Sequence, residues 1–283
     1  MKYTEVTFSV VPFSETACDV VAALTGGIGF DSFVPVEGGV LGYVRTDMYD
    51  ETSLTALMND FPMPEVSVTF VAQPMEDKDW NEEWEKNFFE PIVIGDRCVV
   101  HSTFHHDYPK AEYDIIINPQ MAFGTGHHQT TRLMMGYLLD ADLKGKNILD
   151  MGCGTGILAI LACLRGACHA DAIDIDQWCV DNTYDNMALN GITNISAFCG
   201  DVSALEGKGP YEVIIANINR NILLADMPGY VACMSKEARI FFSGFYECDL
   251  PLLREKAESL GLHYVGHHCD NEWTAAEFQL LSD

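Results

Sequence analysis

The sequence predicts an α/β protein in which a doubly wound sheet of seven strands follows a small ferredoxin-like α+β domain. Three observations support this prediction. From residue 147 onward, apolar segments of strand length alternate with segments of helical periodicity, which is typical of a doubly wound sheet. Residues 3–71 instead follow a β-α-β-β-α-β order, which is that of the ferredoxin-like plait. Gly152, Gly154 and Gly156 separate the first strand of the larger segment from an apolar helix.

Length and charge limit the organisation of the chain and its partners. The 283 residues are enough for two domains, which we place at 1–74 and 93–283, joined by a linker helix at 75–92. With 42 acidic against 16 basic side chains, the formal net charge is −26. Such a surface repels nucleic-acid phosphates and attracts basic partners, although acidity could also serve solubility alone. We therefore expect a basic protein as partner and no direct contact with nucleic acid.

Cysteine usage and the N-terminus bear on the compartment. The ten cysteines include no C-x-x-C pair, so the spacing predicts no metal site. We expect most of them to be small buried apolar residues in a reducing compartment. Residues 1–5 lack the charged-then-apolar pattern of a signal peptide, and no apolar run reaches the length of a membrane span. The sequence predicts a cytoplasmic protein without a membrane segment.

The first domain begins with a strand at Tyr3–Val11, whose residues Val6, Phe8 and Val10 share one face. Ser14 is a plausible N-cap for the helix that follows. The remaining elements are strands at 33–36 and 40–45, a helix at 51–60 and a strand at 66–71. No catalytic cluster is present, so we expect this domain to bind or position a partner.

The segment between the domains is acidic, and Trp80, Trp84 and Phe88 recur every four residues. A helix would place them on one face, as expected of a connecting helix packed against a domain. Short strands are predicted at 91–94, 98–101 and 113–118. The last strand enters a polar loop, and we expect Thr130 or Thr131 to cap the helix after it.

The second domain carries the alternating pattern. Its strands are predicted at 147–151, 172–175, 195–199, 213–217, 239–243, 262–266 and 275–281. Its helices are predicted at 157–165, 177–190 and 248–260. The last two strands can pair as an antiparallel hairpin at an edge of the sheet.

Polar residues mark the carboxyl ends of the predicted strands, where ligands of such sheets bind. Asp150 ends the first strand, and Asp174 ends the second about 20 residues after the glycine turn, where a carboxylate can accept both hydroxyls of a ribose. Asp176 is its rival, although its position is more typical of a helix cap. Asp201 could face an adenine edge, and Asn217 lies where the reacting group would be.

The glycine spacing excludes a dinucleotide fingerprint, because G-x-G-x-x-G would need a glycine at position 157, which is Ile157. The pattern D-x-G-x-G-x-G from Asp150 resembles motif I of class I S-adenosylmethionine-dependent methyltransferases. Together with other segments it resembles the PrmA family, the methyltransferases of large-subunit ribosomal protein L11. The matching segments are the loop 118–131, the turn and helix 150–160, Asp-Ile-Asp at 174–176 and Ala-Asn-Ile at 216–218.

This resemblance implies a site for S-adenosylmethionine and methylation of lysine side chains and of the N-terminal amine of the ribosomal protein. The implied cofactor contacts are Thr131, Gly152, Gly154, Asp174 and Asn217. Two segments depart from the family pattern. The loop reads Gly-His-His-Gln at 126–129 where the family usually has Gly-Thr-His, and position 219 is Asn where the family favours Leu. Both departures leave the geometry of the amine pocket open.

The residue that accepts the proton of the amine is unassigned by the sequence, and His127 is the best candidate. Phe123 could face a methylated amine, since aromatic rings attract quaternary ammonium, or it could anchor the loop in the core. Other interpretations remain open: a methyltransferase of another basic protein, a nucleic acid or a small-molecule amine, or a non-catalytic ribosome-assembly factor that keeps the cofactor fold. Asn-Ile-Asn-Arg at 217–220 lacks the Asn/Asp-Pro-Pro-aromatic motif usual in base-amine methyltransferases.

Overall fold

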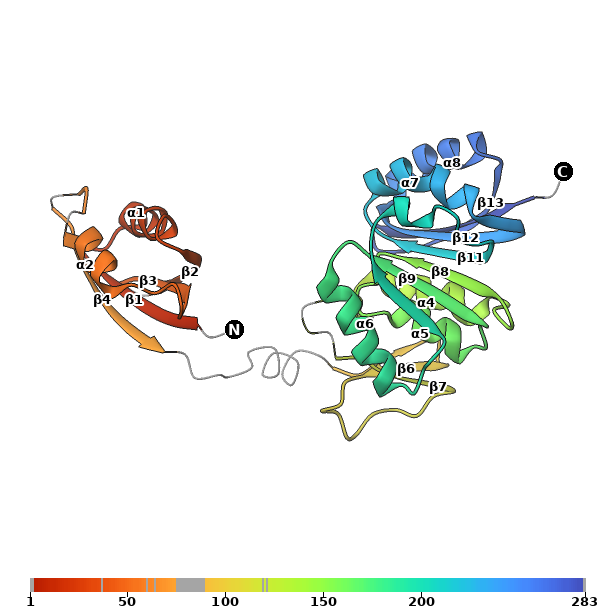
Figure 1. Ribbon diagram of the computed structural model, residues 1–283, viewed down its shortest axis with the longest axis horizontal. Coiled ribbons are helices and arrows are strands. Elements are labelled where there is room, and N and C mark those ends of the chain that lie inside the picture. Colours follow the sequence, from red (N-terminus) through yellow and green to blue (C-terminus); the bar gives the residue numbers. More distant parts are fainter. Residues whose placement is uncertain are drawn as a thin grey trace. The chain divides into compact units, whose positions relative to one another are not determined.

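The computed structural model describes residues 3–36, 38–59, 61–63, 65–74, 90–118, 120 and 122–281. The chain divides into two compact units, Met1–Trp80 and Asn81–Asp283, whose elements can be followed by colour in Figure 1. The predicted linker helix with Trp80, Trp84 and Phe88 lies outside the described residues.

The first unit holds a four-stranded antiparallel sheet with strand order β2-β3-β1-β4. Its elements are β1 (Tyr3–Val11), α1 (Glu15–Gly26), β2 (Phe30–Val36), β3 (Gly39–Arg45), α2 (Glu51–Asn59) and β4 (Ser67–Pro74). The alternating β1 residues Val6, Phe8 and Val10 form one core with Val21 of α1 and Leu54 of α2. Ser14 accepts a hydrogen bond from the amide of Ala17 at 3.2 Å. The predicted ferredoxin-like order and the helix cap are confirmed.

The second unit is built on a seven-stranded sheet with order β10-β9-β8-β11-β12-β14-β13. Its strands are β8 (Asn147–Met151), β9 (His169–Asp174), β10 (Ile195–Cys199), β11 (Tyr211–Asn217), β12 (Met234–Tyr246), β13 (Leu262–Asp270) and β14 (Trp273–Leu280). The first five are parallel to one another. The last two form an antiparallel hairpin, with β14 inserted beside β12 and β13 at the edge. This is the doubly wound arrangement that the sequence predicts.

Helices cover both faces of this sheet (Figure 1). On one face α4 (Gln129–Asp140), α5 (Ile157–Leu164) and α6 (Gln177–Leu189) share an apolar core with the sheet. On the other face α7 (Arg220–Ala232) and α8 (Leu250–Ser259) build a second core. The short strands β5 (Ile92–Ile94), β6 (Cys98–His101) and β7 (Tyr113–Ile116) form a separate three-stranded sheet. Cys98 and Ile115 belong to the core of α4 and α5, so the small sheet extends that layer.

Three features differ from expectation. The helix α7 was not predicted, because Pro228 and Gly229 interrupt its helical pattern and are typical helix breakers. The strands β12 and β13 run well beyond the predicted 239–243 and 262–266, because the added segments 235–237 and 267–270 are mostly polar and form no apolar run. The expectation that most cysteines are buried was wrong: four of the ten are buried, two are half-buried and four are exposed.

Among the residues that the structure describes, no helix is both long and apolar enough to cross a membrane.

Candidate functional site

The glycine turn between β8 and α5 is held against two neighbouring segments. Gly152 and Gly154 have positive φ angles of 72° and 54°, a conformation that side chains rarely adopt. A Cβ on Gly152 would lie 2.3 Å from the Ile218 side chain, and one on Gly154 would lie 2.1 Å from the carbonyl oxygen of Phe123. Glycine is therefore required at both positions, by backbone conformation and by close approach.

Asp174 lies next to this turn, as the sequence predicted. Its two carboxylate oxygens accept hydrogen bonds from the amides of Gly154 and Asp176, at 3.0 and 3.1 Å. Asp176 instead caps α6, with its carboxylate accepting from the amide of Trp178 at 2.9 Å. The two carboxylates thus divide as expected, because Asp174 faces the glycine turn and Asp176 faces the helix.

Asp150 is the buried acid of the site. Its side chain is 1% exposed, one oxygen accepts the amide of Ala159 at 3.1 Å, and the other has no hydrogen-bond partner. Burial raises the pKa of this carboxyl to about 7, and the nearby charge of Asp174 adds to the rise. Through its bond to the Ala159 amide, this carboxyl supports the turn and the start of α5.

The loop before α4 is tied to the glycine turn from the other side. The Thr155 amide donates to the Phe123 carbonyl at 2.9 Å, and the Thr155 hydroxyl donates to the Gly124 carbonyl at 2.6 Å. The two segments that carry the family resemblance are therefore in direct contact. This contact positions Phe123, whose side chain is 54% exposed, so the interpretation of Phe123 as a core anchor applies to its backbone and not to its ring.

Asparagines of α6 fix the strand that leads into this loop. Asn182, Asn186 and Asn190 recur every four residues on one face of the helix. The Asn190 side chain bonds both backbone groups of Ile116 at 2.7 and 2.9 Å. The Asn186 side chain accepts the amide of Asn118 and donates to the carbonyl of Thr155, both at 2.9 Å. This set was not predicted, although the regular spacing of three asparagines was an available signal.

Thr131 lies in the first turn of α4, fully buried, and its hydroxyl oxygen has no hydrogen-bond partner. The expectation that Thr130 or Thr131 caps this helix was wrong. The N-cap is His128, whose Nδ1 accepts the amide of Thr130 at 3.3 Å, because the helix begins at Gln129, before either threonine. The Thr131 hydroxyl therefore has no part in capping this helix.

Asn217 ends β11, and its buried side-chain oxygen has no hydrogen-bond partner. Its neighbour Asn219 has a different role, because it is the N-cap of α7 and its side chain accepts the amide of Ile222 at 3.2 Å. The departure from the family at position 219 is thus explained by helix capping, and it leaves the Asn217 side chain unchanged.

A row of rings lies at the same sheet edge. Phe123 and His128 have ring centroids 5.3 Å apart, His128 and Trp273 4.9 Å, and Trp273 and Tyr246 4.5 Å. Burial and the charge of Arg132 lower the pKa of His128, so this ring stays neutral at pH 7. We call these four residues the aromatic row. Trp273 and Tyr246 were not predicted, because they are far from the loop in the sequence and only the pairing of β12 with β14 brings them together beside it.

The row and Asn217 are linked by strand register. Asn217 pairs with Ser243 of β12, and Ser243 pairs with Ala275 of β14. Trp273 opens β14 two residues earlier, and Tyr246 is its cross-strand partner. The free amide oxygen and the aromatic row therefore share the carboxyl edge of the parallel strands.

Two predicted candidates have other contacts. The ring nitrogens of His127 lie 3.2 Å from the Thr125 hydroxyl and 2.9 Å from the Glu90 carbonyl, contacts that hold the loop. Asp201 accepts the amide and the hydroxyl of Ser203 at 2.9 and 2.6 Å, which caps a short 3₁₀ helix. These hydrogen bonds hold the pKa of the Asp201 carboxyl below its usual value. The role of His127 in proton transfer and that of Asp201 in adenine recognition stay predictions.

Known proteins resemble this chain over most of its length. The family model described as "Ribosomal protein L11 methyltransferase (PrmA)" matches residues 35–280. A protein of Phocaeicola vulgatus named ribosomal protein L11 methyltransferase is 59% identical over 278 residues, which are 98% of this chain and 99% of that protein. A protein of the same name from Chlorobaculum tepidum is 30% identical over 268 residues, or 91% of each chain.

A solved structure also resembles this chain. The crystal structure of a ribosomal protein L11 methylase from Lactobacillus delbrueckii subsp. bulgaricus has a TM-score of 0.64 with this chain at 27% sequence identity. The match covers 69% of this chain and 100% of that one.

Proposed function

The chain belongs to the ribosomal protein L11 methyltransferase (PrmA) family, and on that premise we propose that it transfers methyl groups from S-adenosylmethionine to amino groups of ribosomal protein L11. The acceptors that we propose are lysine side chains and the N-terminal amine. The observation that carries this proposal is the unpartnered amide oxygen of Asn217, which shares one sheet edge with the aromatic row.

The cofactor fits the polar groups that this edge leaves unused. A buried oxygen without a partner costs about 1–3 kcal/mol, and Thr131 and Asn217 each present one. The proposed cofactor contacts are Thr131, Gly152, Gly154, Asp174 and Asn217. Asp174 would accept the ribose hydroxyls, and the glycine turn would admit the ligand close to its backbone. When bound, the cofactor supplies an electrophilic methyl group on a sulfonium ion.

The acceptor must be a neutral amine before it can attack. At pH 7 removal of its proton costs about 4.6 kcal/mol for a lysine and about 1 kcal/mol for an α-amino group. The amide oxygen of Asn217 has two lone pairs, so beside the cofactor contact it can accept an N–H of the neutral amine and align the nitrogen lone pair. Neutral His128 adds no positive charge beside the amine, and Phe123 and Trp273 present ring faces that favour the methylated cation.

The charge of the chain suits a basic substrate. A formal net charge of −26 attracts a protein rich in lysine and arginine and speeds its encounter. We propose that the ferredoxin-like unit docks that protein, since the described residues of this unit show no acid–base cluster of their own. The reducing cytoplasm is the proposed location, because the spacing of the ten cysteines offers no disulfide framework.

The test is methyl transfer to purified ribosomal protein L11, followed by intact-protein and peptide mass spectrometry. We expect methyl groups on lysine side chains and on the N-terminal amine, and none on ribosomal RNA offered separately. Transfer to RNA alone would support the nucleic-acid alternative, and cofactor binding without transfer to any basic protein would support a non-catalytic assembly factor.

A further inference from the structure

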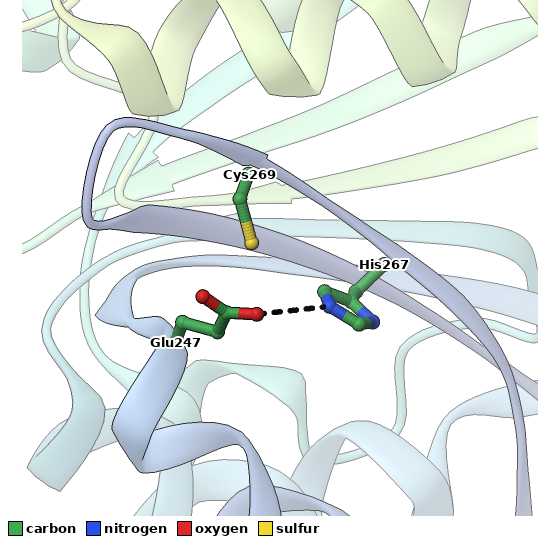
Figure 2. Close-up of side chains that lie close together, drawn as sticks. All are labelled: Glu247, His267 and Cys269. Carbon is green, nitrogen blue, oxygen red and sulfur yellow. Dashed lines mark ion pairs between the residues drawn. The ribbon is translucent and has the colours of Figure 1, made fainter.

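Three metal-ligating side chains meet beside the terminal strand hairpin (Figure 2). His267 and Cys269 are two residues apart on the edge strand β13, so both point to the same face. Glu247 begins the short 3₁₀ helix Glu247–Asp249 that follows β12. The Glu247 amide donates to the Glu272 carbonyl at 3.1 Å, which holds this segment against the hairpin turn.

The donor atoms of the three side chains all lie within 4.8 Å of one another. The Glu247 Oε1 to His267 Nε2 distance is 3.7 Å, and Figure 2 shows the sulfur of Cys269 directed toward the space between these two groups. In a tetrahedral zinc site with bonds of about 2.0–2.3 Å, neighbouring donors are about 3.3–3.8 Å apart. The Glu247 side chain is 64% exposed, so its rotation can close the remaining gap.

Neighbouring hydroxyls orient two of these ligands. The Tyr264 hydroxyl lies 2.5 Å from Nδ1 of His267, which leaves Nε2 directed toward Glu247. The Thr274 hydroxyl lies 3.3 Å from the sulfur of Cys269 and can donate to a thiolate. A hydrogen bond to the second ring nitrogen of a ligating histidine is a regular feature of zinc sites, because it fixes the ring and its tautomer.

Space for a fourth ligand is present next to the cluster. A hollow of about 330 Å³ is lined by Tyr246, Glu247, Cys248, Asn271 and Glu272. A zinc ion held by three protein ligands keeps one coordination position for water or another molecule, and Glu247 and Cys269 are exposed, so solvent can reach this position.

We propose that Glu247, His267 and Cys269 bind a zinc ion. Thiolate, imidazole and carboxylate together favour Zn²⁺ over the hard cations, which prefer oxygen ligands alone. On binding, the Cys269 thiol releases its proton to solvent and sulfur forms the bond to the metal. The ion joins the edge strand to the segment after β12, beside the contact between Tyr246 and Trp273, and takes no part in methyl transfer.

The first experiment titrates the metal-free full chain, kept reduced, with Co²⁺ as a spectroscopic substitute for zinc. We expect one equivalent to produce a thiolate-to-cobalt charge-transfer band and zinc to displace it. Cys269→Ser should abolish the band, and His267→Ala or Glu247→Gln should weaken binding by at least about tenfold. Cys168→Ser and His263→Ala, which remove an exposed thiol and an exposed imidazole elsewhere, should leave the titration unchanged.

The second experiment uses the unmodified chain, so that it does not depend on the folding of a variant. Stoichiometric zinc should protect Cys269, and not Cys168, from alkylation by iodoacetamide, as measured by peptide mass spectrometry. Absence of the charge-transfer band in the wild-type chain, its persistence in Cys269→Ser, or alkylation of Cys269 at the same rate with and without zinc would each overturn the proposal.

Discussion

At the scale of single residues, the site depends on pairs of like side chains with different roles. Asp174 faces the glycine turn and Asp176 caps α6, while Asn217 keeps a free oxygen and Asn219 caps α7. The sequence could place Asp174 and Asn217 at the carboxyl edge because both end apolar strands of a parallel sheet, and their contacts with the cofactor stay predictions. The sequence could not show that Asn219 is a helix cap and not a residue of the site, because that distinction depends on where α7 begins.

Asp174→Ala should weaken binding of S-adenosylmethionine by at least about a hundredfold, because each hydrogen bond to a carboxylate contributes about 1.5–3 kcal/mol and a ribose would use two. Calorimetry of the purified variant measures this. The matched control is Asp176→Ala, which should lower stability by about 1 kcal/mol through loss of a helix cap and leave cofactor affinity within about twofold. Equal affinity losses in both variants would show that the two carboxylates do not divide as described.

Asp150 makes stability depend on pH. Its pKa rises from an ordinary value of 3.8 to about 7 in the folded chain, so the folded state binds more protons than the unfolded state between these values. Stability contributed by this group is therefore lost as pH rises from about 4 to about 7.

Asp150→Asn should remove that loss. The stability of the variant relative to wild type should increase by roughly 2–3 kcal/mol between pH 5 and pH 8, whatever constant penalty the buried amide adds. Urea unfolding at the two pH values measures the difference. A relative stability that stays constant, or that declines with pH, would contradict a raised pKa at this position.

At the scale of elements, each strand of the large sheet could be predicted because it contains a short apolar run, although the polar parts of β12 and β13 were missed. The helix α7 could not, since Pro228 and Gly229 interrupt its pattern while Leu223, Met227 and Tyr230 still pack into the core. The aromatic row and the Glu247, His267 and Cys269 cluster could not be predicted either. Both are assembled by the hairpin of β13 and β14 from segments that are far apart in the sequence.

The asparagines of α6 give a test at this scale. Asn186→Ala should destabilise the second unit by about 2–3 kcal/mol, because the Asn118 amide and the Thr155 carbonyl lose their partner while buried. The same variant should also bind S-adenosylmethionine more weakly, since the loop and the turn lose a shared anchor. Gln177→Ala on the exposed side of the helix is the control and should change stability by less than about 0.5 kcal/mol. A similar effect for both variants in thermal unfolding would refute the anchoring role.

At the scale of the whole molecule, the chain combines a ferredoxin-like unit with a methyltransferase unit on a strongly acidic surface. The order of elements was predictable in the first unit and, apart from α7, in the second, because a β-α-β-β-α-β pattern and an alternating pattern can each be inferred from hydrophobic periodicity. The sequence could not predict which acidic side chains contact a basic partner, because net charge determines long-range attraction and not the docking position.

Raising the salt concentration should lower kcat/KM for the ribosomal protein more than kcat, because screening slows the encounter of opposite charges and leaves the bound complex largely unaffected. Steady-state kinetics at low and high ionic strength measure both constants. The reference substrate is a short peptide of zero net charge that carries an acceptor amine, and its kcat/KM should change little. An equal kcat/KM for the ribosomal protein at both ionic strengths would exclude electrostatic steering.

The central claim is that Asn217 aligns the amine for methyl transfer at the sheet edge. Its most direct test compares wild type, Asn217→Ala and Asn219→Ala by single-turnover methylation of ribosomal protein L11, followed by intact-protein mass spectrometry. We expect Asn217→Ala to lower the transfer rate by at least about a hundredfold. Asn219→Ala should lose about 1 kcal/mol of stability and transfer methyl groups at nearly the wild-type rate. Transfer by Asn217→Ala at the wild-type rate would contradict this role of Asn217.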